Sequence, residues 1–113
     1  MSARLAAGIE VSALIRRVNS LGGNAAVLAR GDAEAGAILL LLAERGIPFG
    51  LFERALDQRG DYGWRRAGSG NIDDLQGFNQ YIARRRAIDG DLWVVELDIP
   101  GVERFAAEMI ATG

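Results

Sequence analysis

One stretch of the sequence, residues 71–99, constrains the fold most, because it predicts a helix, a sharp stop and a strand in direct succession. Asn71 is a suitable helix cap, and Asp74 stands three residues later, as in a capping box. Asp73 and Asp74 place negative charge in the first turn, where the helix dipole favours it. Apolar residues at helical spacing predict a buried stripe along this helix. The stripe comprises Leu75, Phe78 and Ile82, with Tyr81 beside it.

Sequence signals also indicate the end of this helix and the strand after it. Three arginines, at positions 84–86, fill the last turn, where positive charge is favoured, and Gly90 is expected to be a left-handed stop. The strand that follows has one wholly apolar face, and its other face becomes polar towards the end. The apolar face carries Trp93, Val95, Leu97 and Ile99, and the other carries Leu92, Val94, Glu96 and Asp98. This succession indicates a helix folded back over the sheet that the strand joins.

An amphipathic helix is predicted near the start of the chain, where apolar residues follow the i, i+3, i+4, i+7 spacing. Its stripe comprises Val11, Leu14, Ile15 and Val18, continued by Leu21. Gly22 and Gly23 are expected to end it. A last short helix is predicted after Gly101, with Val102, Phe105, Ala106, Met109 and Ile110 as its apolar positions.

Strands are expected over residues 24–30, 36–43 and 47–56, with residues 62–67 as an optional fourth. The second of these is apolar on both faces, which is typical of a central strand covered on both sides, although its leucines also favour a helix. Short connections between consecutive strands favour an antiparallel meander. The expected fold class is therefore α+β, an antiparallel meander of about four to five strands packed with two to three helices in the order α-β-β-β-(β)-α-β-α. At 113 residues, a single domain spanning residues 1–113 is expected.

The composition removes several common chemistries. Cysteine and histidine are absent, so there is no thiol chemistry and no imidazole base or metal ligand. Lysine is absent too, and all 13 basic residues are arginine, which excludes a lysine Schiff base. The many alanines and glycines indicate GC-rich coding bias, which by itself accounts for arginine in place of lysine. No catalytic residue or cofactor is predicted, and an enzyme is not the favoured interpretation.

The sequence also favours a cytoplasmic protein. The first eight residues lack the apolar core of a signal peptide. The longest apolar run, residues 35–43, is too short to cross a membrane. A net charge of −2 provides no general attraction to a membrane surface or to nucleic acid.

The arginines suggest one alternative function. Those at positions 16–17, 65–66 and 84–86 are candidates for a basic patch, with Tyr62, Trp64 or Trp93 stacking on bases. Consecutive helical residues point about 100° apart, however, so residues 84–86 cannot share one face. Nucleic-acid or nucleotide binding is therefore an alternative that is not favoured.

Two pairs of acidic residues suggest a second alternative function, metal binding. Asp89 with Asp91, and Asp32 with Glu34, are oxygen ligands of the kind that Mg²⁺ or Ca²⁺ uses. Neither pair completes an EF-hand loop, and turns also favour these residues. A Mg²⁺-dependent enzyme would require three or more acidic side chains to converge in the fold, with Asp89 or Asp91 among them. No metal site is assigned on the sequence alone.

The favoured hypothesis is a non-catalytic protein–protein interaction or homodimeric module that binds an unknown partner or itself. Trp64 is flanked by glycine and arginine and is the better of the two tryptophans for an exposed interface anchor, whereas Trp93 is expected in the core. An open sheet edge would offer a further contact. The interaction candidates are Trp64, Arg65, Arg66, Arg84, Arg85 and Asp91.

Several short segments together resemble a family of small alphaproteobacterial proteins known as domain of unknown function 1491. These are Val11-Ser-Ala-Leu-Ile-Arg-Arg17, Arg30-Gly-Asp32, Ala35-Gly-Ala37, Tyr81-Ile-Ala-Arg-Arg85 and Asp91-Leu-Trp-Val-Val-Glu96. The resemblance covers residues 5–98 and is poor over residues 47–69. It implies a bacterial, cytoplasmic, single-domain protein and supplies no activity or site. It also suggests a structural ion pair between turns, among Arg30, Asp32, Arg85 and Asp91.

Overall fold

A computed structural model of the chain describes residues 5–56, 58–68 and 74–112. Within them the order of elements is α-β-β-β-β-α-β-α, as predicted, and the α+β class is confirmed. The elements are α1 (Ala7–Ser20), β1 (Asn24–Ala29), β2 (Ile38–Glu44), β3 (Ile47–Leu56), β4 (Tyr62–Arg66), α2 (Leu75–Ile88), β5 (Trp93–Asp98) and α3 (Val102–Thr112). Among the described residues, none of the helices has the length and hydrophobicity of a membrane-spanning segment.

The five strands form one sheet in the order β1-β5-β2-β3-β4. β5 lies between β1 and β2, antiparallel to the first and parallel to the second, so the sheet is mixed. The predicted antiparallel meander holds only for β2, β3 and β4. The helix α2 carries the chain across the sheet between β4 and β5, which frees β5 from pairing with its predecessor. β5 is buried along both faces near its start. A central position in the sheet allows both of these apolar faces to be covered.

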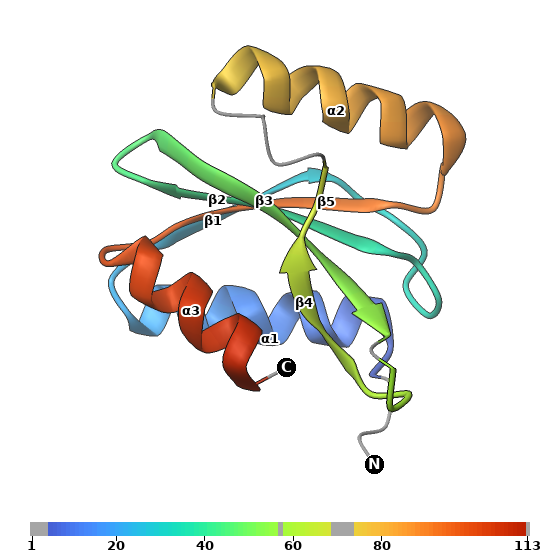
Figure 1. Cartoon of the computed structure of the whole chain (residues 1–113), viewed down its shortest axis with the longest axis horizontal. Coiled ribbons are helices and arrows are strands. Elements are labelled where there is room, and N and C mark those ends of the chain that lie inside the picture. The colour runs from blue at the N-terminus through green and yellow to red at the C-terminus, as the bar shows by residue number, and fades with distance from the viewer. Residues whose placement is uncertain (1–4, 57, 69–73, 113) are drawn as a thin grey trace.

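The molecule has three layers, with α2 on one face of the sheet and α1 and α3 on the other (Figure 1). We call these the α2 face and the α1/α3 face. β2 is buried from Ile38 to Ala43, which confirms the prediction of a central strand covered on both sides. Its alternate side chains enter the two cores, with Leu39 and Leu41 towards α2 and Leu40 and Leu42 towards α1 and α3.

The helix α1 begins without a side-chain cap. Instead, the backbone N–H groups of Ala7 and Gly8 donate to the carbonyls of Glu34 and Ala33, at 3.1 and 2.9 Å. The predicted stripe is buried at Val11, Leu14 and Val18 and half-buried at Ile15. Leu21 is 51% exposed, because the helix ends at Ser20 and the chain turns away at Gly22, where φ is 84°.

The helix α2 starts later than predicted. Asp74 is its N-cap, and its carboxylate accepts the Gly77 N–H at 2.7 Å, while the predicted cap Asn71 and the neighbouring Asp73 lie outside the described residues. Leu75 at the first helical position is 51% exposed, so the buried stripe is reduced to Phe78 and Ile82.

The predicted left-handed stop at Gly90 is wrong. The helix α2 ends at Ile88, and its cap Asp89 is extended, with φ at −129°. The Asp89 carboxylate accepts the Asp91 N–H at 2.9 Å, and this local turn redirects the chain without a left-handed residue. In α3, the predicted positions Val102, Phe105, Ala106 and Met109 are buried, whereas Ile110 is 49% exposed.

Candidate functional site

The six predicted interaction residues lie on three different elements. Trp64, Arg65 and Arg66 belong to β4 at one edge of the sheet, Arg84 and Arg85 belong to α2, and Asp91 lies in the turn before β5. The structure brings Arg65 and Arg85 to the same carboxylate, that of Glu53 on β3, at 3.6 and 3.1 Å. Arg85 also donates to the Tyr81 hydroxyl at 3.0 Å. This one carboxylate therefore forms ion pairs with two of the predicted candidates.

The guanidinium of Arg85 is held as a cation by its surroundings. Burial is the largest single influence and lowers its pKa, but the hydrogen bond and attraction to Tyr81 and the nearby Glu53 carboxylate together raise the pKa above its ordinary value. The group links α2 to β3 across the α2 face. These contacts are typical of a structural ion pair.

The other β4 candidates face the opposite side of the sheet. Arg66 lies over the rings of Phe49 and Phe52, with its guanidinium carbon 5.1 and 5.0 Å from their centroids. Trp64 is half-buried and packs against the core on the α1/α3 face. Arg84, which precedes Arg85 on α2, is exposed.

The proposed ion pair between turns is not found among the described residues. Asp32 uses its carboxylate within its own turn, where it accepts the N–H groups of Glu34 and Ala35 at 3.2 and 2.7 Å. Arg30 stacks over Trp93 at 5.5 Å, and Arg85 pairs with Glu53. The two turns do meet, but through the backbone, where the Asp32 N–H donates to the Asp91 carbonyl at 3.0 Å.

Trp93 lies in the core as predicted, with 4% of its surface exposed. Its indole N–H donates to the Asp32 carbonyl at 2.7 Å. Gly31 lies against the same turn, because a Cβ on it would lie 2.2 Å from the Asp91 carbonyl oxygen. The turn at residues 30–36 is thus packed closely onto the start of β5.

The convergence of acidic side chains that the Mg²⁺ alternative predicts is also not found. Across the described ranges, no group of three or more His, Cys, Asp or Glu side chains is placed to hold a metal ion. Asp32 and Asp89 each cap a turn instead.

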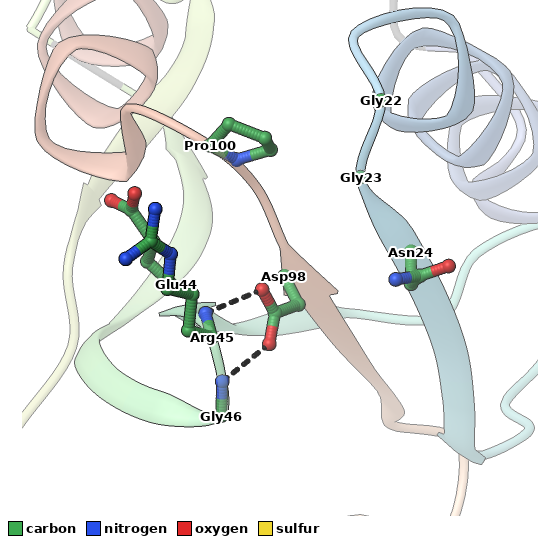
Figure 2. A pocket seen from close by; sticks show the side chains of 8 residues that line it. All are labelled: Gly22, Gly23, Asn24, Glu44, Arg45, Gly46, Asp98 and Pro100. Carbon is green, nitrogen blue, oxygen red and sulfur yellow. Dashed lines mark hydrogen bonds between the residues drawn. The ribbon is translucent and has the colours of Figure 1, made fainter.

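A polar hollow of about 380 Å³ lies between the turn after α1 and the β2–β3 turn (Figure 2). Arg45 and Gly46 both have positive φ, at 52° and 77°, as a two-residue hairpin turn requires. The Asp98 carboxylate accepts both of their N–H groups, at 2.9 and 2.8 Å. Glu44 also lines this hollow, and its carboxylate accepts the Val102 N–H at 3.3 Å.

Sequence reasoning did not single out the edge strand β1, which exposes two large apolar side chains. Within the described residues it pairs only with β5. Val27 and Leu28 are 45% and 51% exposed, and a bulge between Val27 and Ala29 leaves Leu28 without a cross-strand partner. The available signal was its composition, Asn-Ala-Ala-Val-Leu-Ala, which contains no charge and no proline.

A groove of about 430 Å³ runs between β1 and the first half of α1. Gly8 and Ser12 line the groove on the α1 side. Its walls include Ile9, which is 60% exposed, together with Val27 and the Trp93 ring beneath Arg30. Val27 belongs both to β1 and to the wall of this groove, which also contains Glu34. We call Ile9, Val27, Leu28 and Arg30 the β1 surface.

Comparison with known proteins places this architecture in a family. The family described as "Protein of unknown function (DUF1491)" matches residues 5–107. The chain belongs to the DUF1491 family. The match confirms the resemblance carried by the short segments and covers the whole β1 surface.

Solved DUF1491 proteins share the fold. A crystal structure from Caulobacter crescentus CB15 is 34% identical, with a TM-score of 0.76 over 84% of this chain and 88% of that one. An NMR structure from the same organism is 33% identical, with a TM-score of 0.75 over 88% and 90% of the two chains. A structural-genomics solution structure from A. tumefaciens is 33% identical, with a TM-score of 0.69 over 88% and 90%. No curated protein matches this DUF1491 chain.

Proposed function

We propose that this DUF1491 chain is a non-catalytic, single-domain module that binds a protein segment along the open edge of β1. The proposal places it in the bacterial cytoplasm, as the family resemblance implies. The observation that carries it is the β1 surface, an uncharged edge strand beside an apolar groove. An extended segment that adds to such an edge gains backbone hydrogen bonds, and a groove beside the edge receives its side chains.

The contrast between the two edges of the sheet supports this assignment. Proteins protect exposed edges with charges, prolines or bulges, because a bare edge pairs with any available strand. β4 carries Arg65 and Arg66, whereas β1 has no charge and only the bulge at Leu28. An edge that lacks charged protection is typical of one that a partner covers.

The proposal locates the contact on β1 rather than on the residues predicted from sequence. Glu53 engages Arg65 and Arg85, and Arg66 lies over two phenylalanine rings, which supports structural roles for these three. Trp64, Arg84 and Asp91 stay secondary candidates. None of these three residues is part of the β1 surface.

Selection of random extended peptides displayed on phage tests the proposal. We expect wild-type protein to enrich peptides with aliphatic residues at alternating positions. The Leu28→Lys variant should lose their binding by about ten-fold or more, because a charge is placed on the apolar edge. Leu56→Lys is the matched control, since Leu56 lies on β3 and is 54% exposed against 51% for Leu28.

Both variants should unfold at the wild-type temperature, because both side chains already contact solvent. Failure to enrich any peptide, or peptides that bind the Leu28→Lys variant as tightly as wild type, would contradict the proposal.

A further inference from the structure

We propose that the segment that covers the β1 surface is β1 of a second copy of this chain, so that two sheets join into one continuous sheet around a two-fold axis near Val27. This inference rests on the proposed function and names its partner. A two-fold contact requires one surface to be complementary to itself. β1 meets this requirement, because its six residues carry no charge, and so no like charges would face each other across the axis.

Antiparallel pairing of the two β1 strands centred on Val27 fixes which residues lie opposite each other. Val27 lies opposite Val27 of the other copy, and Arg30 lies opposite Asn24. In each copy, Val27 shares the α1/α3 face with its cross-strand partner Val95. The exposed side chains of Val27 and Ile9 are therefore on the face where the two α1 helices would approach each other.

The two ends of β1 carry groups of opposite charge, with Arg30 at one end, where Glu34 also lines the groove, and Glu44 and Asp98 at the other. Arg30 at one end stacks over Trp93 and takes part in none of the ion pairs between described residues. The other end begins at Asn24, whose cross-strand neighbour is Asp98. The hollow there presents two carboxylates, Glu44 and Asp98, against one guanidinium, Arg45.

The C-terminal end of α1 lies at that same end of β1, since Asn24 follows Ser20 by four residues. The negative end of the helix dipole attracts a cation there. In the two-fold pair, Arg30 of each copy reaches this negatively polarised end of the other. The same contact forms twice.

The size of the contact sets the expected strength. One six-residue strand edge with the flanking α1 side chains lies at the small end of specific interfaces. We therefore expect a reversible dimer with a dissociation constant on the order of tens of micromolar. The association should be visible only when the protein concentration is raised.

Sedimentation equilibrium across concentrations from about 1 µM to 1 mM covers this range. Wild-type protein should pass from monomer to dimer. Val27→Lys and Val27→Glu should each weaken dimerisation by at least about ten-fold, because like charges then face each other across the axis. An equimolar mixture of the two variants should dimerise again, since the charges are then opposite.

Ile47→Lys is the control, because Ile47 is an exposed β-branched strand residue on β3 and 71% exposed. It should dimerise as wild type does. Restoration by mixing also separates loss of pairing from loss of folding, because a misfolded variant does not regain a partner.

A wild-type protein that stays monomeric at all concentrations would overturn this inference, and so would a mixture of Val27 variants that stays monomeric. Either result would leave the peptide selection to decide the proposed function. Peptides that bind the Leu28→Lys variant normally would instead overturn binding at the edge, while a wild-type dimer insensitive to both Val27 substitutions would show that the copies meet elsewhere.

Discussion

At the scale of single residues, Arg54 shows how a polar side chain is tied into the fold. Its side chain is 3% exposed and forms an ion pair with Glu10 of α1. It also donates to the carbonyls of Leu5 and Gly36, at 3.2 and 3.3 Å, and lies over the Tyr62 ring at 5.6 Å. One guanidinium thus joins β3 to the start of α1 and to the segment before β2.

Replacing Arg54 by alanine should lower the free energy of unfolding by about 3 kcal/mol, because it leaves partners without their donor and Glu10 without its counter-ion. Arg104→Ala is the control. Its ion pair with Glu108 is exposed, with 88% of the Arg104 side chain in solvent, so less than about 1 kcal/mol is expected. Urea unfolding of both variants measures the difference, and equal losses would show that the Arg54 contacts contribute little.

At the scale of elements, α2 is held to the sheet by few side chains. Phe78 and Ile82 are its buried residues, with Tyr81 and Arg85 half-buried beside them. By contrast, β2 is buried from Ile38 to Ala43 on both faces. Helical spacing placed Leu75 in the same stripe as Phe78, yet Leu75, at the first position of α2, is 51% exposed.

A pair of alanine substitutions tests this account of α2. Ile82→Ala should cost about 3 kcal/mol of unfolding free energy, because Ile82 is 9% exposed and its loss leaves a cavity against the sheet. Leu75→Ala should change it by less than about 0.5 kcal/mol, since its side chain is half in solvent. Thermal or urea denaturation compares the two. A similar loss for both would show that Leu75 packs as the periodicity predicted.

At the scale of the whole molecule, the arginines are distributed rather than gathered. Glu53 engages Arg65 and Arg85, Glu108 engages Arg17 and Arg104, and Glu10 engages Arg54. Each of these acidic groups offsets positive charge on its own part of the surface. The net charge of −2 then leaves little attraction for a polyanion.

This distribution predicts no salt-sensitive nucleic-acid binding. Fluorescence anisotropy with labelled single-stranded RNA and duplex DNA, first at low salt where electrostatic attraction is strongest, measures it. We expect no saturable binding at protein concentrations up to about 100 µM, the weak end of non-specific affinities. A micromolar affinity that falls steeply with added salt would contradict this and restore the arginine alternative. Arg84→Ala would then be the first variant to compare, because Arg84 is exposed.

Much of the fold was predictable where local chemistry decides it. The bounds of β3 match the prediction from residue 47 to 56, and its hairpin with β2 follows from Arg45 and Gly46 in the turn. The burial of Val11, Leu14 and Val18 follows from helical spacing alone. The candidate site was less predictable, because the exposure of Val27 and Leu28 depends on which strand becomes an edge.

The amino-acid sequence by itself determined the element order, the central position of β2 and the absence of thiol, imidazole and lysine amine chemistry. Periodicity reports which side of an element is apolar, and that is a local property. Only the tertiary structure decided that β5 enters between β1 and β2, that β1 is left at an edge, and that Glu53 collects two arginines from different elements. These outcomes join residues far apart in the chain, and alternation along a strand selects its buried face but not its neighbours.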